Sequence, residues 1–219
     1  MTLYIIIASL ITCFVLHVVL YQLSGSLGLL ELPGGRKIHE GAIPLIGGIA
    51  IYLSCVIIIF LFPLNNYIAI FMLLLLPVFL VGVIDDIFDI SAKFRLAFQF
   101  FISLIAVNLL SLDVGVSRIL PNNFLFAGIL DQLISVLFIV TLMNAINMMD
   151  GMDGVVGSML LLSLLAVTHV QAKSAVGNTN QLINVIIPCL VIFLFFNLVI
   201  KPGQYYGKVF MGDAGRDRK

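Results

Sequence analysis

The sequence has little charge, no tryptophan, and only three cysteines and three histidines in 219 residues. Eleven basic residues balance eleven acidic ones, so only 10% of the chain is charged and the formal net charge is zero. Soluble domains carry about 25% charged residues, and disordered chains combine low hydrophobicity with high net charge. A chain that is 62% hydrophobic fits neither class, and its balanced charge gives no reason to expect nucleic-acid binding. The composition is typical of a protein that lies in a lipid bilayer.

Long uncharged runs predict where the chain crosses the bilayer. A helical span needs about 20 apolar residues to cross a hydrocarbon core of about 30 Å. The runs are continuously apolar, without the alternation of a membrane β-barrel. We therefore expect an all-α, polytopic membrane helical bundle that forms a single domain over residues 1–219. About seven transmembrane helices are expected, near 3–23, 46–62, 67–84, 96–111, 128–146, 155–171 and 182–200.

The distribution of basic residues predicts the orientation of these helices. Seven helices place four loops on one side, and those loops hold nine of the eleven basic residues. The opposite loops hold only Arg118 and Lys173. Because cytoplasmic loops carry the excess of Lys and Arg, we expect the N-terminus outside and the C-terminus in the cytoplasm. The nine residues are Arg36, Lys37, Lys93, Arg95, Lys201, Lys208, Arg216, Arg218 and Lys219.

Isolated polar residues within the expected helices are interpreted as structural. Cys13, Cys55 and Cys189 fall inside spans without CxxC spacing, so they predict neither a disulfide framework nor a zinc site. His17 lies in the middle of an apolar helix, where a packed, hydrogen-bonded histidine is favoured over a ligand. Asp131, near the outer end of the fifth helix, is expected at the membrane interface.

Three clusters of acidic residues all fall on the expected cytoplasmic side. The first is Asp85-Asp86-Ile-Phe-Asp89, at the end of the third expected helix. A solvated helix end is one interpretation, but adjacent acids at a helix C-terminus oppose the macrodipole and repel each other. A nearby cation would remove both costs, and hard oxygen ligands suit Mg²⁺ or Mn²⁺.

The second cluster follows the fifth expected helix and the third follows the seventh. Asn147, Asp150 and Asp153 recur at a spacing of three among several glycines, which indicates one helical face or its frayed extension. A glycine-rich hinge capped by Asn and Asp is the structural alternative. Asp213 lies in Gly-Asp-Ala-Gly, which taken alone is typical of an ordinary turn.

Basic residues accompany the acids on the same side. Arg36, Lys37 and His39 lie in the first expected cytoplasmic loop, and Lys93 and Arg95 follow the aspartate pair. Such residues set topology and contact anionic lipid. Acids and bases on one membrane face also match a site where cations neutralise a transferring phosphoryl group.

Four ordered motifs resemble those of a known family. They read R-K-I-H-E-G-A-I-P-L-I-G-G at 36–48, D-D-I-F-D-I-S at 85–91, N-A-I-N-M-M-D-G-M-D-G at 144–154 and K-V-F-M-G-D-A-G at 208–215. Together they resemble the polyprenyl-phosphate N-acetylhexosamine-1-phosphate transferases (glycosyltransferase family 4), and most closely their undecaprenyl-phosphate N-acetylglucosamine branch. The resemblance covers residues from about 30 to 215.

The resemblance implies a transferase of the bacterial cytoplasmic (inner) membrane. It implies transfer of GlcNAc-1-phosphate from UDP-GlcNAc to undecaprenyl phosphate at the cytoplasmic face. The products are undecaprenyl-diphosphate-GlcNAc and UMP, in the first lipid-linked step of a cell-surface polysaccharide. The implied cofactor is Mg²⁺ or Mn²⁺, and the implied partners are both substrates and the bilayer, with no nucleic acid.

The resemblance also implies roles for individual residues, each carried over from a matching motif position. Catalysis is expected of Asp85, Asp86 and Asp150, and metal binding of Asn147 and Asp213. Substrate binding is expected of Lys37, His39, Asp89, Lys93 and Asp153.

The chain departs from the family pattern after the last motif. The resemblance implies a chain that runs well past 300 residues with ten or eleven helices, whereas this chain reads Arg216-Asp-Arg-Lys219 after the last motif. We therefore expect a C-terminally shortened chain that lacks the family's later helices and their histidine motif. Two alternatives to an active transferase are a truncated, non-catalytic remnant of such an enzyme and a cation-coupled membrane transporter. The acids at span ends favour a transferase over a transporter, whose acids lie near the bilayer midplane.

Overall fold

A computed structural model describes residues 2–31, 42–62, 65–88, 90–115, 126–149, 154–173, 180–199 and 208–211. Within these ranges the protein is helical apart from one short strand pair. The described ranges contain seven α-helices: α1 (Thr2–Leu23), α2 (Gly47–Leu61), α3 (Asn66–Phe88), α4 (Ala92–Leu110), α5 (Ala127–Met149), α6 (Val155–Lys173) and α7 (Asn180–Leu194). A π-helical turn, η2 (Phe195–Val199), continues α7. The predicted all-α membrane bundle of seven helices is confirmed.

Within the described part of the chain, length and composition identify five stretches that can cross a membrane. They are α1, α3, α4, α5 and the continuous stretch Gln181–Val199, with mean hydropathy from 1.5 to 2.8. The helices α2 and α6 are apolar but shorter. Each helix carries large exposed apolar side chains, such as Phe60, Leu73 and Leu162. These exposed side chains suit contact with lipid tails rather than with water.

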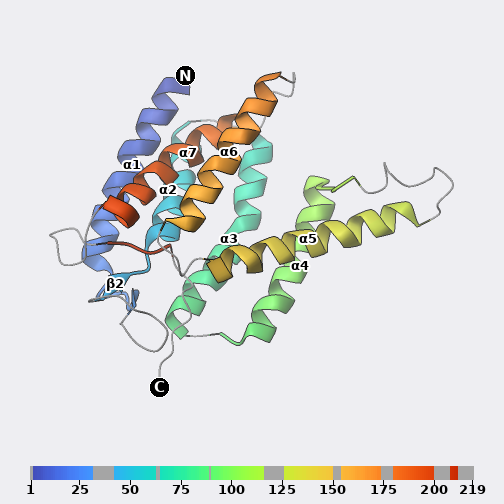
Figure 1. Ribbon diagram of the computed structural model, residues 1–219, viewed down its shortest axis with the longest axis horizontal. Coiled ribbons are helices and arrows are strands. Elements are labelled where there is room, and N and C mark those ends of the chain that lie inside the picture. Colours follow the sequence, from blue (N-terminus) through green and yellow to red (C-terminus); the bar gives the residue numbers. More distant parts are fainter. Residues whose placement is uncertain are drawn as a thin grey trace.

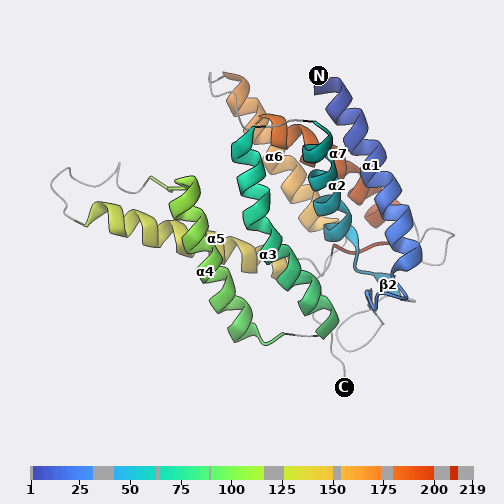
Figure 2. The same ribbon diagram turned by 180° about the vertical axis from the view of Figure 1, so that it is seen from behind.

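The helices form two groups that meet at α3 (Figures 1 and 2). In the first group, α7 packs against α1, α2 and α6. In the second, α4 packs against α3 on one side and α5 on the other, and α5 crosses the neighbouring helices steeply in both views. The larger core of the first group buries residues of α1, α2, α3 and α7, and the core between α4 and α5 buries Val107, Val136 and Val140.

At their C-terminal ends, α3 and α5 continue through polar residues beyond the apolar runs that predicted them. The third was expected to end at 84, but α3 continues to Phe88 and therefore contains Asp85 and Asp86. The fifth was expected to end at 146, but α5 continues to Met149 and contains Asn147. Both endpoints were wrong because they followed the loss of apolar residues, whereas a helix can continue through polar residues whose backbone bonds remain satisfied.

A short antiparallel strand pair was not expected from the sequence. The strands are β1 (Leu30–Glu31) and β2 (Ile43–Pro44). Leu45 follows β2, donates its backbone N–H to the carbonyl oxygen of Leu29 at 2.9 Å, and forms a parallel bridge with Phe210. This backbone pairing brings the start of α2 against the last described residues of the chain.

The isolated polar residues have packed positions. His17 is fully buried, its Nδ1 donates to the carbonyl oxygen of Cys13 at 2.9 Å, and its ring stacks on Phe196 at 5.0 Å between centroids. The three cysteines are free and buried. Asp131 is buried near the start of α5 and accepts a hydrogen bond from the backbone N–H of Gly115 at 3.1 Å. His17 and the cysteines are therefore packed within helices, as predicted, and Asp131 holds the chain that follows α4.

Candidate functional site

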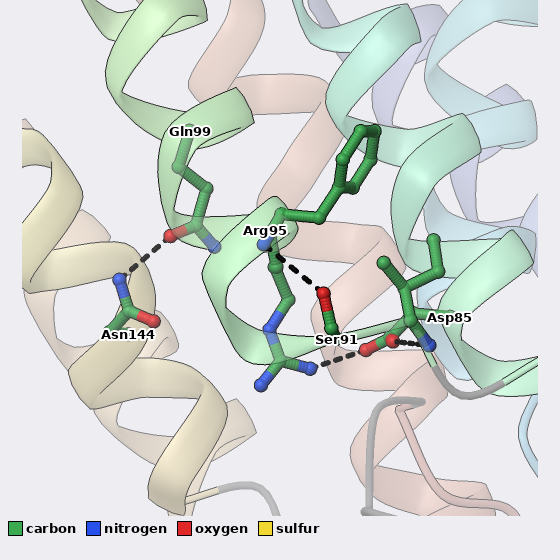
Figure 3. Close-up of polar contacts among 7 residues, drawn as sticks. Asp85, Ser91, Arg95, Gln99 and Asn144 are labelled. Atoms are coloured by element: carbon green, nitrogen blue, oxygen red, sulfur yellow. Dashed lines mark hydrogen bonds and ion pairs between the residues drawn. The ribbon is translucent and has the colours of Figure 1, made fainter.

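The last turn of α3 holds a buried carboxylate whose two oxygens both accept hydrogen bonds. Asp85 is 6% exposed, and its Oδ1 accepts from the backbone N–H of Ile90 at 2.8 Å. Its Oδ2 accepts from Nη1 of Arg95, with which it forms an ion pair (Figure 3). Charge-assisted bonds of this kind are about twice as strong as neutral ones. Asp85 therefore fixes both the chain that leaves α3 and the first turns of α4.

The start of α4 places Arg95 beside Asp85. Ser91 is the N-cap residue, and its Oγ accepts from the backbone N–H of Phe94 at 3.4 Å. The backbone N–H of Arg95 donates to the carbonyl oxygen of Ser91 at 3.1 Å. A serine N-cap satisfies a donor that the first turn would otherwise leave unpaired. The cap therefore starts α4 four residues before the expected boundary and turns Arg95 toward α3.

An amide pair joins α4 to α5 one helical turn further along. Nδ2 of Asn144 donates to Oε1 of Gln99 at 2.7 Å and also to the carbonyl oxygen of Val140 at 2.8 Å. Gln99 is 9% exposed. Figure 3 shows this pair beside the Asp85–Arg95 ion pair, with Arg95 and Gln99 both on α4. Polar contacts thus link α3, α4 and α5 in sequence.

A pocket of about 280 Å³ lies where these three helices meet residues 208–211. Its polar lining comes from Arg95, Gln99 and Asn147. Its other lining residues are Val78, Val81, Gly82, Phe98, Met143, Ile146 and Met211. The pocket therefore combines a cationic group and two amides with apolar walls, a lining suited to an amphiphile with an anionic head.

The 208–211 segment is held by donors from two other elements. Its carbonyl oxygens at Val209, Phe210 and Met211 accept hydrogen bonds of 2.8–2.9 Å. The donors are Nδ2 of Asn197 in η2 and the backbone N–H groups of Gly47 and Gly48 at the start of α2. Because three consecutive carbonyl groups are hydrogen-bonded, this segment is held in a single register. Met211 is thereby placed in the pocket wall.

The glycine pair is needed for this approach. A Cβ at Gly47 would lie 2.5 Å from the Phe193 ring and 2.9 Å from the carbonyl oxygen of Phe210. A Cβ at Gly48 would lie 3.0 Å from the carbonyl oxygen of Met211. The Pro-Leu-Ile-Gly-Gly motif thus has a structural role that its sequence did not reveal.

Four of the ten predicted site residues lie within the described ranges. Asp85 is buried, Asp86 and Asn147 are half-buried, and Lys93 is exposed in the first turn of α4. Asn147 lines the pocket together with Arg95, the ion-pair partner of Asp85. The other six lie outside the described residues: Lys37, His39, Asp89, Asp150, Asp153 and Asp213.

Sequence reasoning missed three polar residues of this region. Arg95 was identified only as one of several basic residues, Asn144 only as part of a motif, and Gln99 not at all. Their spacing carried a signal, because Arg95 and Gln99 are four apart and Asn144 and Asn147 are three apart, so each pair shares a helix face.

The described part of the chain contains no group of three His, Cys, Asp or Glu side chains that could hold a metal ion. Of the predicted site residues, Asn147 offers an amide in the pocket lining, and Asp86 offers a carboxylate one residue after Asp85 in α3; both are half-buried. Amide and carboxylate oxygens are hard ligands of the kind that Mg²⁺ takes, alongside substrate phosphates and water. The donor chemistry therefore fits such a cation.

The chain resembles curated proteins along most of its length. It is 31% identical to the undecaprenyl-phosphate alpha-N-acetylglucosaminyl 1-phosphate transferase of Haemophilus influenzae, over 92% of this chain and 57% of that protein. It is 29% identical to the protein of the same name from Salmonella typhi, over 86% of this chain and 52% of the relative. The Escherichia coli K12 protein is 27% identical over 89% of this chain and 53% of the relative.

The chain thus spans about half the length of the curated relatives that it matches. The sequence pattern of glycosyl transferase family 4 matches residues 67–216, which include the aspartate pair, the pocket-lining helices and the 208–211 segment. On this match, the chain is a multi-pass membrane protein that belongs to glycosyl transferase family 4.

Proposed function

We propose that this protein transfers GlcNAc-1-phosphate from UDP-GlcNAc to undecaprenyl phosphate at the cytoplasmic face of the bacterial inner membrane. A phosphate oxygen of the lipid attacks the sugar-bearing phosphorus of UDP-GlcNAc. The phosphoanhydride bond breaks, and UMP leaves with the bridging oxygen. The product, undecaprenyl-diphosphate-GlcNAc, is a lipid-linked precursor for a surface polysaccharide.

One observation carries this proposal: residues of two motifs that are far apart in the sequence border a single pocket, together with Arg95, the ion-pair partner of Asp85 in a third motif. Arg95 lines the pocket from the first turn of α4, and Asn147 lines it from the end of α5. Met211 lines it from the segment that precedes Gly212-Asp213. The named relatives act on undecaprenyl phosphate, which is a phosphorylated lipid. An apolar pocket with a guanidinium at its polar side is suited to such a head group, because guanidinium binds phosphate oxygens well.

The buried carboxylate has a holding role in this proposal. Both oxygens of Asp85 accept hydrogen bonds, from Ile90 and from Arg95. Asp85 therefore orients the guanidinium toward the pocket, and Asp86, the next residue in α3, is the carboxylate that we assign to the reacting phosphates. The lipid phosphate is already largely ionised at neutral pH, since its second pKa is about 6. Orientation and charge neutralisation therefore matter more than proton removal.

A divalent cation completes the proposed site. Asn147 and Asp86 would contribute to holding Mg²⁺ or Mn²⁺, with Asp213 as a further ligand from the fourth motif. When bound, such a cation neutralises the charge on the phosphates of the two substrates. The residues of this chain hold and orient the two anionic substrates.

The experiment uses purified protein in nanodiscs with undecaprenyl phosphate, radiolabelled UDP-GlcNAc and Mg²⁺. We expect equal amounts of UMP and labelled lipid, and loss of product when chelator replaces Mg²⁺. Asp85→Asn, Asp86→Asn, Asn147→Leu and Asp213→Asn should each lower the rate by about 100-fold or more. Asn108→Leu is the control, because Asn108 is an exposed amide at the far end of α4. Absence of UMP with wild-type protein, or full activity in all four variants, would reject the proposal.

A further inference from the structure

In the described part of the chain, two amide pairs bridge α4 and α5, one beside the pocket and one further from it. Near the pocket, Asn144 donates to Gln99 at 2.7 Å, and both side chains are buried or half-buried. At the far end, Nε2 of Gln132 donates to Oδ1 of Asn108 at 2.8 Å, and that pair is exposed. The two contacts have the same chemistry and nearly the same length. They differ in burial and in distance along the helices from the pocket.

The inner pair lies one turn from residues on both walls of the pocket. Gln99 follows Arg95 by four residues on α4, and Asn144 precedes Asn147 by three on α5. Residues three or four apart are neighbours on one face of a helix. The hydrogen bond between Gln99 and Asn144 therefore ties the helix turn that carries Arg95 to the turn that carries Asn147.

The amide of Asn144 is fixed in orientation. Nδ2 carries two hydrogens, and this nitrogen donates to Oε1 of Gln99 and to the carbonyl oxygen of Val140. The helices around it are apolar, with Val107, Val136 and Val140 forming the core between α4 and α5. Interhelical hydrogen bonds between amides contribute to helix association in membranes, where polar groups lack water as an alternative partner.

We propose that Gln99 and Asn144 are positioning residues that set the separation between the Asp85–Arg95 ion pair and Asn147 across the pocket. The inference rests on the proposed function for its catalytic consequence, but its structural part does not. Gln99 also lines the pocket whereas Asn144 does not, so substitution of Asn144 tests the spacing without removing a lining side chain. The pair acts by holding α5 at one distance from α4, so that the cation ligand on α5 faces the ion pair that orients the substrate phosphate.

The structural part is tested by measuring the distance between spin labels on α4 and α5. Phe94 and Met148 are 55% and 87% exposed, in the first turn of α4 and the last turn of α5. Both are replaced by cysteine, and the three native cysteines remain because they are at most 2% exposed. Protein without the two new cysteines checks that the native thiols are not labelled.

We expect one narrow distance distribution in this doubly labelled protein. Asn144→Leu and Gln99→Leu should each broaden or shift it, because leucine cannot make the interhelical hydrogen bond. Asn108→Leu removes the matched outer bond and should leave the distribution unchanged. The reciprocal exchange Gln99→Asn with Asn144→Gln keeps one long and one short amide and should restore the narrow distribution.

The catalytic part is tested by titrating Mg²⁺ in the transferase assay. Groups that orient a metal ligand typically change metal affinity by 10- to 100-fold when mutated. Asn144→Leu should therefore raise the Mg²⁺ concentration for half-maximal rate by about tenfold, with a smaller change in the KM for UDP-GlcNAc. The reciprocal exchange should restore most of the Mg²⁺ response, which a general loss of folding would not allow.

The outcomes separate this inference from the proposed function. A distance distribution that is the same in wild type, Asn144→Leu and Gln99→Leu overturns the positioning role, whatever the activity. A shifted distribution with an unchanged Mg²⁺ response also overturns it. A wild-type protein that releases no UMP rejects the proposed function, and the label distances then still decide whether the pair sets the spacing of α4 and α5.

Discussion

The backbone N–H of Gly47 donates a hydrogen bond of 2.9 Å to the carbonyl oxygen of Phe210, 163 residues later in the chain. This contact joins the Pro-Leu-Ile-Gly-Gly motif to the segment before Gly212-Asp213. The first and fourth motifs are therefore linked through backbone atoms. The link explains why the Pro-Leu-Ile-Gly-Gly part of the first motif, which has no ionisable side chain, accompanies the three acidic motifs.

Substitution of Gly47 tests this link. A Cβ there would lie 2.5 Å from the Phe193 ring and 2.9 Å from the Phe210 carbonyl oxygen. Gly47→Ala should therefore lower the free energy of unfolding by about 1–3 kcal/mol through overpacking, and transfer activity should fall with it. The measurement is the midpoint temperature of thermal unfolding in nanodiscs. The transfer rate is measured well below that temperature.

Gly128 provides the matched control for Gly47. It also lies in the first turn of a helix, and a Cβ at that position meets nothing within 4 Å. Gly128→Ala should leave stability unchanged or raise it by up to about 1 kcal/mol, as helix propensity predicts. Equal effects of the two substitutions would contradict a specific role for Gly47.

The Asp85–Arg95 ion pair predicts a non-additive mutant cycle. The side chain of Asp85 is 3% exposed and that of Arg95 is 25% exposed. Arg95→Leu leaves a buried carboxylate without its cationic partner, at a cost of about 3–5 kcal/mol in stability. Adding Asp85→Asn to Arg95→Leu should recover a large part of that loss, because the stranded charge is removed. Thermal unfolding of the two single variants and the double variant measures the coupling.

Activity should not follow stability in this cycle. The double variant regains a folded α3–α4 turn but has no guanidinium at the pocket, so transfer should stay low. Arg95→Lys keeps the charge without the planar fork of donors, and it should retain more activity than Arg95→Leu. Recovery of full activity in the double variant would show that the ion pair serves folding alone.

The fold could be predicted from the sequence wherever the length of an apolar run determines that a helix forms. All seven helices were predicted, because a run of apolar residues between charged or turn-forming segments specifies a buried or lipid-facing helix. Helix ends were less predictable where a polar group satisfied the backbone. Ser91 starts α4 at residue 92, and polar residues such as Asp85 and Asn147 do not stop α3 and α5 at their apolar limits.

The acidic motifs of the candidate site could be predicted from the sequence, but the contacts between side chains of different helices could not. Asp85 and Asn147 drew attention because carboxylates and amides are rare in apolar helices. Nothing in the order of residues indicated that Arg95 would pair with Asp85, or that Gln99 would meet Asn144, since both contacts depend on the packing of α3, α4 and α5. Glycine-mediated backbone contacts such as Gly47 with Phe210 leave no side-chain signature at all.

The orientation of the protein in the membrane gives a last prediction, which concerns the two ends of α5. Phe126, immediately before α5, and Met148, in its last turn, are 62% and 87% exposed. The excess of basic residues in the loops on the Met148 side predicts that this side faces the cytoplasm. Phe126→Cys should therefore react with a membrane-impermeant maleimide in right-side-out vesicles, and Met148→Cys only in inverted ones. The native cysteines are buried and provide an unreactive background in the parent protein. The opposite labelling pattern would place the pocket on the outer face, away from cytosolic UDP-GlcNAc, and would contradict the proposed reaction as well as the topology.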